Sequence, residues 1–145
     1  MENRSIDMRE NWIQILKPDD FPKGGYFVVT DFRQNVDGMK IVLEDERDYV
    51  VEILFDGYPE LTRISYEGER MRTWMEVQKK YQDQNFFADW FFYKVENSKL
   101  SQWIEEESYT SLLAEDFTHY CIITGDNVVD IVSSIEPAIV CKSTV

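Results

Sequence analysis

Cysteine, histidine, proline and glycine are scarce in this sequence, and each shortage excludes a class of protein or site. Two cysteines, Cys121 and Cys141, are too few for the disulfide framework of small secreted domains, so we expect both thiols to be free. A single histidine, His119, excludes metal sites built from several imidazoles. Four prolines and six glycines leave no Pro/Gly-rich linker. The chain is therefore predicted to form one domain over residues 1–145.

Familiar catalytic, cofactor and membrane signals are absent as well. The sequence contains no Gly-x-Gly-x-x-Gly turn, phosphate-binding loop, HExxH helix, Cys-x-x-Cys pair or EF-hand loop. The most apolar run, residues 86–95, is interrupted by Asp89 and Lys94 and is shorter than a membrane span. Residues 1–12 lack the apolar segment of a secretory signal. We expect a cytoplasmic protein that is not an enzyme and holds no cofactor or metal.

Basic residues are few relative to acidic ones. The chain has 28 Asp and Glu against 15 Lys and Arg, which gives a formal net charge of −13. Such a surface repels nucleic-acid backbones and anionic lipid headgroups. Nucleic acid and membrane are therefore not expected as partners, and a basic protein is favoured. The oligomeric state stays open.

Apolar and aromatic residues are abundant, at 43% and 14% of the chain, which indicates a folded core. β-Branched and aromatic runs predict strands, and the turn residues between them predict hairpins. Amphipathic spacing predicts a helix over 69–81 and a second short helix capped by Ser98. The expected strands are 26–33, 39–45, 48–56, 61–67, 86–96, 117–124 and 127–133. The fold class is thus α+β, a curved antiparallel meander sheet of about seven strands with two or three helices packed on one side.

The single domain divides into three expected segments. Residues 1–24 are predicted to hold an N-terminal helix, over 8–16, and a lead-in. Residues 25–138 form the sheet-and-helix core, and residues 139–145 form a tail. The helix is expected to stop at Lys17 because the residue before a proline is pushed out of the helical region.

The acidic residues are unevenly distributed along the chain. Between Leu100 and Cys141 there are eight acidic residues and no Lys or Arg. If the second helix ends near Ser108, three of them occupy its last turn, where the helix dipole disfavours negative charge. If instead it continues to Leu113, that cost disappears. We predict that these carboxylates bind a basic partner; the candidate residues are Glu105, Glu106, Glu107, Glu115, Asp116, Asp126 and Asp130.

Other candidate sites have ordinary structural explanations. His119 and Cys121 lie two residues apart on one strand face and could contact each other, but a hydrogen-bonded histidine within the sheet is favoured. Five acidic residues at two hairpin ends could hold a divalent cation, although hydrated turns explain them better. These are Asp37, Glu44, Asp45, Glu46 and Asp48. The aromatic run at 86–93 is favoured as core over a ligand pocket.

Two segments carry a resemblance to a known group of proteins. HYCIITGDNVVDIVSSIEP and the preceding FFADWFFYKVENSKLSQWIEEES resemble small acidic proteins of Gram-positive bacteria that are associated with immunity genes beside polymorphic toxins. The likeness covers residues 25–138. It implies an immunity protein that neutralises a toxin, and it assigns no individual residue a role. The acidic charge favours a basic, nuclease-like toxin domain, because the substrate groove of a nuclease attracts phosphates.

Two other function classes remain open. The first is a small-ligand-binding protein or enzyme with a pocket under the curved sheet, using His119, Asp89 or Tyr93 as polar groups. The second is a structural subunit of a larger complex, which the aromatic content and the acidity explain equally well.

Overall fold

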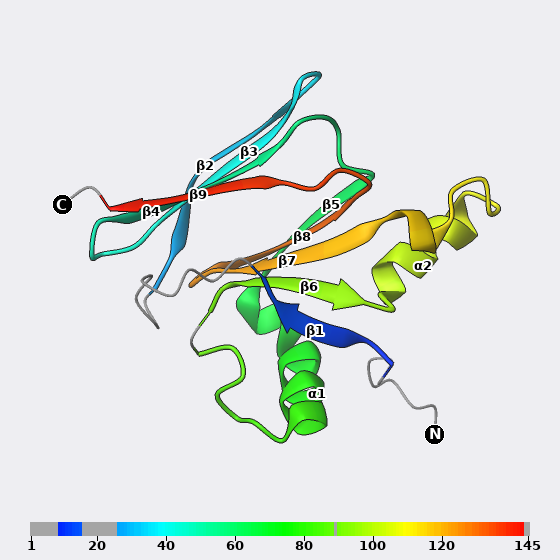
Figure 1. The fold of residues 1–145 in the computed structure, drawn as a ribbon. Coiled ribbons are helices and arrows are strands. Elements are labelled where there is room, and N and C mark those ends of the chain that lie inside the picture. The colour runs from blue at the N-terminus through cyan, green and yellow to red at the C-terminus, as the bar shows by residue number, and fades with distance from the viewer. Residues whose placement is uncertain (1–8, 16–25, 89, 144–145) are drawn as a thin grey trace.

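Two antiparallel sheets form the body of the protein (Figure 1). The structure is a computed structural model that describes residues 9–15, 26–88 and 90–143. The first sheet has the order β1-β6-β7-β8-β5, and the second has the order β2-β3-β4-β9. The first comprises β1 (Asn11–Gln14), β6 (Phe92–Glu96), β7 (Thr118–Ile123), β8 (Asn127–Ser133) and β5 (Leu61–Tyr66). The second comprises β2 (Val28–Asn35), β3 (Gly38–Glu44), β4 (Tyr49–Phe55) and β9 (Ala138–Ser143).

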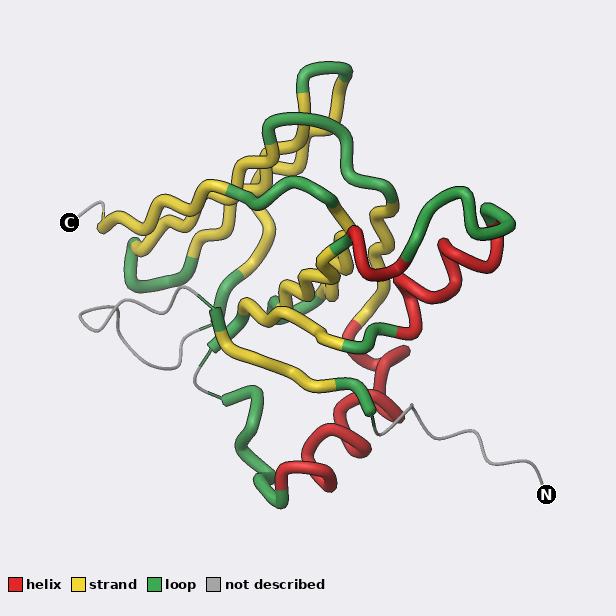
Figure 2. Tube along the Cα trace, turned by 45° about the vertical axis from the view of Figure 1, so that its right-hand side comes forward, coloured by secondary structure: helices red, strands yellow, loops and turns green. Residues whose placement is uncertain are grey.

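Two α-helices, each adjoined by a 3-10 turn, complete the described chain. The turn η1 (Glu67–Arg70) leads into α1 (Met71–Tyr81), and α2 (Lys99–Glu107) is followed by η2 (Ala114–Asp116). Figures 1 and 2 show α1 on the side of the first sheet that faces away from the second, whereas α2 lies at one end of the strands. The helices therefore do not share one covering layer. Neither is long and apolar enough to cross a membrane.

The core lies on both faces of the first sheet. On one face, this sheet packs against the second sheet, where the rings of Phe55 and Tyr120 meet with centroids 5.7 Å apart. On the other face, Trp74 of α1 contacts Phe87 at 5.0 Å, and Phe87 contacts Tyr93 at 5.3 Å. Because both faces are covered, the central strands β7 and β8 are buried at most positions.

The predicted α+β class agrees with this architecture, but the single seven-stranded meander is wrong. The segment Leu61–Tyr66 is a strand as expected, yet it pairs with β8 instead of β4 and so joins the other sheet. A ninth strand, β9, returns to pair with β4. Sheet membership is therefore decided by partners far apart in sequence.

At both ends of the chain, segments that were not predicted as strands pair with distant strands. Residues Asn11–Gln14 form β1 instead of the predicted helix over 8–16, because they pair with β6 from Asn11↔Glu96 to Gln14↔Tyr93. Residues 8 and 16 lie outside the described residues. The predicted tail over 139–145 is also wrong, since β9 extends from Ala138 to Ser143.

Predictions that depend on local sequence are confirmed. Hairpins connect β2 to β3, β3 to β4 and β7 to β8 at the expected turns. The helix expected over 69–81 is η1 with α1, although α1 buries Trp74 and Val77 and leaves Met71 and Met75 exposed. Ser98 caps α2 as predicted, by accepting a hydrogen bond from the Ser101 N–H at 3.1 Å.

The long strand predicted over 86–96 begins only at Phe92. The preceding aromatic residues form a loop whose rings pack on α1 and the sheet. Phe86 stacks on Tyr81 at 4.6 Å with an interplanar angle of 9°, and it also contacts Tyr93 at 5.6 Å. The interpretation of these aromatics as core is thus confirmed for the described residues, but their backbone is not extended.

Candidate functional site

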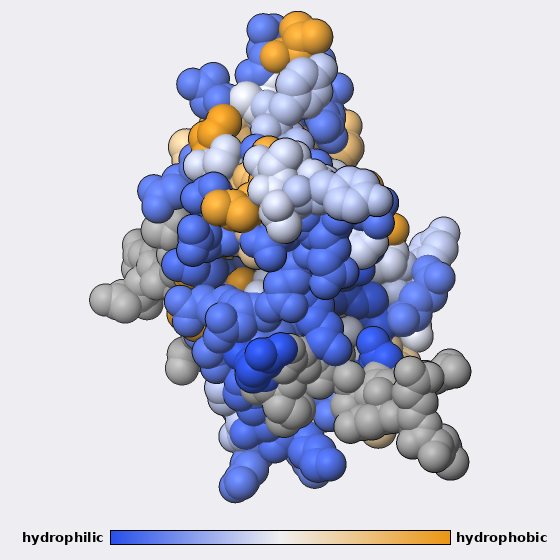
Figure 3. All heavy atoms as spheres, turned by 90° about the vertical axis from the view of Figure 1, so that its right-hand side faces the viewer, coloured by the Kyte–Doolittle hydropathy of each residue, from blue (hydrophilic) through white to orange (hydrophobic). Residues whose placement is uncertain are grey.

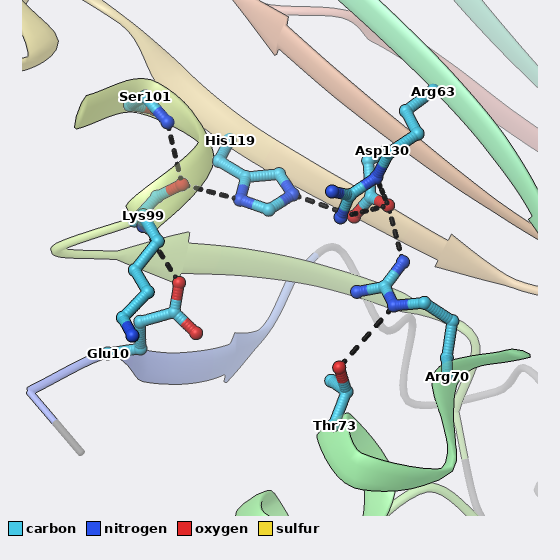
Figure 4. A network of polar contacts seen from close by, with 9 residues as sticks. Glu10, Arg63, Arg70, Thr73, Lys99, Ser101, His119 and Asp130 are labelled. Atoms are coloured by element: carbon cyan, nitrogen blue, oxygen red, sulfur yellow. Dashed lines mark hydrogen bonds and ion pairs between the residues drawn. The ribbon is translucent and has the colours of Figure 1, made fainter. Parts of the chain in front are cut away.

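A buried carboxylate, Asp130, is the centre of a polar network (Figure 4). Its Oδ2 accepts hydrogen bonds from Nε and Nη2 of Arg63 at 3.1 and 3.0 Å, and from Nη1 of Arg70 at 2.6 Å. Its Oδ1 lies 2.8 Å from Nε2 of His119. The side chain of Asp130 is completely buried, and Arg70 is only 13% exposed. Both carboxylate oxygens are therefore bound within the protein.

Strand register brings most of this network together. Asp130 of β8 lies opposite Arg63 of β5 on one side and opposite Cys121 of β7 on the other. His119 is two residues before Cys121 and so points to the same face of the sheet. Arg70 enters from η1, which follows β5 directly and precedes α1 on that face. Four separate elements thus converge on one carboxylate.

The ionisation of Asp130 follows from these contacts. Burial by itself raises the pKa of the carboxyl group, because it disfavours the charged form. The hydrogen bond from His119 and the charges of His119, Arg70 and Arg63 act in the opposite direction and outweigh burial. The pKa of Asp130 therefore lies well below its usual range, and the group is an anion throughout the physiological range.

His119 links this network to the start of α2. Its Nδ1 lies 2.7 Å from the Ser98 hydroxyl, which also accepts the Ser101 N–H as the cap of α2. Both ring nitrogens are hydrogen-bonded when Nε2 donates to Asp130 and Nδ1 accepts from the Ser98 hydroxyl. The interpretation of His119 as a buried, hydrogen-bonded histidine is confirmed, since it is only 3% exposed. Both ring nitrogens are engaged elsewhere, so the geometry gives no support to a His119–Cys121 nucleophilic pair.

The two cysteines are free, as predicted, and differ in their surroundings. Burial raises the pKa of the Cys121 thiol, and the neighbouring Asp130 charge raises it further. We expect a thiol-reactive dye to modify half-buried Cys141 in the native protein and Cys121 at least ~1,000-fold more slowly, on transient unfolding. Absorbance measured on Cys141→Ser isolates the slow thiol. Rapid labelling of that variant under native conditions would contradict the buried assignment.

A cavity of about 320 Å³ lies beside the network. Its wall includes Arg63, Arg70 and His119 from the network, together with Trp12 of β1 and Lys99 of α2. Figure 4 shows these elements around a common space, with β1 and the first turn of α2 on one side and η1 with α1 on the other. Arginine, indole and ammonium groups are hydrogen-bond donors, so the wall is suited to an acceptor.

Five of the seven predicted partner-binding residues lie on α2 and η2, which contact one another. Glu106, Glu107, Glu115 and Asp116 are exposed, and Glu105 is half-buried with its Oε1 accepting the Ala114 N–H at 3.0 Å. None of the five forms an ion pair with a described residue. We call this set the α2 acidic surface. Figure 3 looks at this end of the molecule and shows a mainly hydrophilic face with a few hydrophobic residues.

The other two predicted residues belong elsewhere. Asp130 is a buried structural carboxylate, so its assignment to a contact surface is wrong for this conformation. Asp126 is exposed, but it lies in the turn between β7 and β8, at the opposite end of β7 from η2, and its Oδ1 accepts from the Tyr26 hydroxyl at 3.4 Å. A basic partner that covers α2 would not reach Asp126 without spanning the length of the strand.

A groove of about 710 Å³ lies between α2, η2 and the neighbouring parts of β6 and β7. Carboxylates from α2, η2 and β6 line it together with two basic residues. The charged residues are Glu96, Glu105, Glu106, Glu115, Arg9 and Lys94. The groove extends the α2 acidic surface inward.

The acidic hairpin ends do not form a metal centre within the described chain, where no group of three or more His, Cys, Asp or Glu residues is arranged to hold an ion. Asp45 instead organises its own turn. Its Oδ1 accepts the backbone N–H of Arg47 and of Tyr49, each at 3.0 Å, and its Oδ2 pairs with the Arg47 guanidinium at 2.7 Å.

The arginines and this cavity were not identified from the sequence, and Ser98 was predicted only as a helix cap. One signal was available: Asp130 is the only charged residue in the apolar strand Asn127–Ser133, and such a residue has to be paired inside the protein. No family model, curated protein or solved structure matches this chain.

Proposed function

We propose that this protein binds and neutralises a basic partner through the α2 acidic surface, as an immunity-type inhibitor of a nuclease-like toxin domain. The observation that carries the proposal is the last turn of α2, which holds Glu105, Glu106 and Glu107 and no basic residue. The helix dipole makes each carboxylate there unfavourable by about 0.3–1 kcal/mol. A cationic partner removes this cost, and residues that oppose local stability are expected at functional surfaces.

Exposed apolar side chains next to the acidic residues support a protein partner. Trp103 is 49% exposed and Tyr109 is 93% exposed, and both lie within or directly after α2. Aromatic side chains are enriched at the centres of protein interfaces, where they contribute much of the binding energy. Tyr109 and Thr110 also adopt left-handed backbone angles, with φ of 52° and 61°. Such a conformation is uncommon for these residue types and is often found at functional sites.

The chemistry of the partner follows from the charge. The substrate groove of a nuclease attracts phosphates, and carboxylates can occupy the same positions as those phosphates. The proposal implies that the protein acts in the cytoplasm, where such a domain would reach nucleic acid. It also implies that the adjacent gene encodes a larger protein with a basic C-terminal domain.

Reversing two charges on the α2 acidic surface tests this function. We expect Glu106→Lys with Glu107→Lys to slow association with that basic domain by about 10–100-fold at ~0.1 M salt, because long-range attraction sets the association rate. The loss should shrink at ~1 M salt, where the screening length falls to about 3 Å. Stopped-flow association rates and rescue of cells that express the domain provide the two measurements.

The matched control reverses two exposed charges on the second sheet, Asp37→Lys with Asp56→Lys. It changes the net charge by the same amount but leaves α2 intact, so we expect at most a few-fold loss of rate. Equal losses in both double variants would show a net-charge effect without a binding face. Normal association of the α2 variant would overturn the proposal.

A further inference from the structure

Two arginines beside the cavity at Asp130 are held in fixed positions, and they have no role in the proposed function. Arg63 uses Nε and Nη2 on Asp130, and Arg70 uses Nη1 on Asp130 and Nε on Thr73 at 3.4 Å. A guanidinium is planar, so fixing two of its nitrogens also fixes the third. Arg63 Nη1 and Arg70 Nη2 therefore remain as preoriented donors with no partner among the described residues.

The unused donor of Arg70 points into the cavity. Figure 4 shows its remaining terminal nitrogen directed away from Asp130 and Thr73, into the space enclosed by Glu10, Lys99 and His119. The wall of the cavity includes these same residues. Arg70 is only 13% exposed, so this donor is partly shielded from water and its interaction with an anion is correspondingly strong.

A second, independent observation is the indole of Trp12. Trp12 lies in the cavity wall, is 4% exposed, and its Nε1–H has no hydrogen-bond partner among the described residues. The other buried indoles are satisfied, since Trp74 donates to the Glu67 carbonyl at 3.0 Å and Trp90 donates to the Ile15 carbonyl at 2.9 Å. A buried donor without an acceptor is rare in native proteins, and this one belongs to a ring that lines the cavity.

The acidic residues around the cavity are already engaged. Glu10 accepts the Lys99 N–H at 2.9 Å, Glu69 accepts the Tyr66 N–H at 3.1 Å, and Asp130 is shared by the two arginines and His119. Four basic side chains, with Arg72 as the fourth, thus face three carboxylates. In a chain of net charge −13, this gathering of basic side chains around one cavity is unusual.

We propose that this cavity binds a small ligand through a carboxylate or phosphate group, with Arg63, Arg70 and Lys99 neutralising the anion and the Trp12 ring forming part of the wall. The volume of about 320 Å³ admits a compact metabolite-sized molecule and excludes a folded partner. The site is distinct from the α2 acidic surface, so either can exist without the other.

The Trp12 indole provides a site-specific reporter in NMR spectra of the full chain. Inorganic phosphate and succinate are titrated separately to ~20 mM at constant ionic strength, with sodium chloride as the reference, since a dissociation constant of ~1 mM marks weak binding. We expect a saturable shift of the Trp12 Nε1–H resonance, assigned by its loss in Trp12→Phe, while the Trp74 and Trp90 indole resonances stay in place. A response to phosphate alone or to succinate alone supports the site and identifies the anionic group.

Substitutions on the exposed side of the cavity complete the test. Arg63→Gln and Lys99→Gln are each expected to weaken binding by ~10-fold, because each removes a charged hydrogen-bond donor. Arg33→Gln, on the second sheet, should bind as the wild type does. Unchanged Trp74 and Trp90 resonances confirm that the variants are folded. The proposal is overturned if neither anion shifts the Trp12 resonance more than chloride does, or if Arg63→Gln and Lys99→Gln bind as tightly as Arg33→Gln.

Discussion

Replacing Asp130 with asparagine is expected to lower the free energy of unfolding by about 3–5 kcal/mol, because removal of one partner of a buried ion pair leaves an uncompensated charge. The charge left behind is that of Arg70, which is 13% exposed and cannot move into bulk water without disrupting η1. Arg63, at 45% exposure, can be hydrated more easily. Urea unfolding monitored by tryptophan fluorescence measures the loss.

The control for this variant is Asp126→Asn, which changes the same residue type on the exposed turn of the same hairpin. It should alter stability by no more than about 0.5 kcal/mol. If Asp130→Asn also changes the free energy of unfolding by no more than this, the carboxylate does not hold β5, β7, β8 and η1 together.

The stability of the wild type relative to Asp130→Asn should depend on pH in a defined direction. The pKa of Asp130 is lowered in the native state, so below pH ~4 the unfolded chain binds a proton at this residue that the folded chain does not. The stabilisation is complete above that pH and is lost as pH falls toward the native pKa. The stability difference between wild type and Asp130→Asn should therefore shrink as the pH falls below ~5. A difference that grows on acidification would contradict the assigned ionisation.

Gly38→Ala is the second substitution with a large expected effect. Gly38 ends the turn between β2 and β3 with φ of +144°, a conformation that side chains rarely adopt. An added Cβ would lie 2.1 Å from the carbonyl oxygen of Phe55 and 2.9 Å from the Gly57 nitrogen, which are backbone atoms and cannot rotate away. We expect a loss of about 3 kcal/mol or more, equivalent to a fall in Tm of roughly 6–12 °C.

Gly68→Ala is the matched control, because a Cβ at Gly68 meets no atom within 4 Å and its backbone does not require glycine. Its Tm should change by at most ~2 °C. Similar melting temperatures for the two variants would show that the β2–β3 hairpin can open without affecting the rest of the protein.

Local sequence was sufficient to predict the elements whose signals are contained within a few residues. The cap at Ser98, the hairpin turns and the helix Met71–Tyr81 follow from side-chain hydrogen bonding, turn chemistry and hydrophobic spacing. The end of α2 at Glu107 also resolves the alternative left open by the sequence, and it places three carboxylates in the last turn. These features need no knowledge of distant strands.

Features that depend on distant pairing were not predictable in this way. Residues Asn11–Gln14 have helical spacing in isolation, but they pair with β6. About 80 residues of chain separate the two strands, so the pairing leaves no local signal. Assignment of β5 and β9 to different sheets has the same origin, because nothing within either strand specifies its partner.

The candidate site shows the same division. The α2 acidic surface lies within one helix and the turn that follows, so charge counting along the chain could find it. The Asp130 network joins residues from β5, η1, β7 and β8, and only the strand register brings them together. Counting Asp130 with the surface acids was wrong because charge alone does not distinguish a solvated carboxylate from one buried among arginines.

The Ser98 hydroxyl takes part in two structures at once, since it caps α2 and lies within hydrogen-bond distance of His119. A continuous chain of contacts therefore leads from the arginines at the cavity, through Asp130 and His119, to the first turn of the helix that displays the carboxylates. If occupancy of the cavity alters the affinity for a protein on α2, thermodynamic reciprocity requires that protein to alter the affinity of the cavity by the same factor. Under the proposed function, the strength of inhibition would then follow the concentration of the small anion.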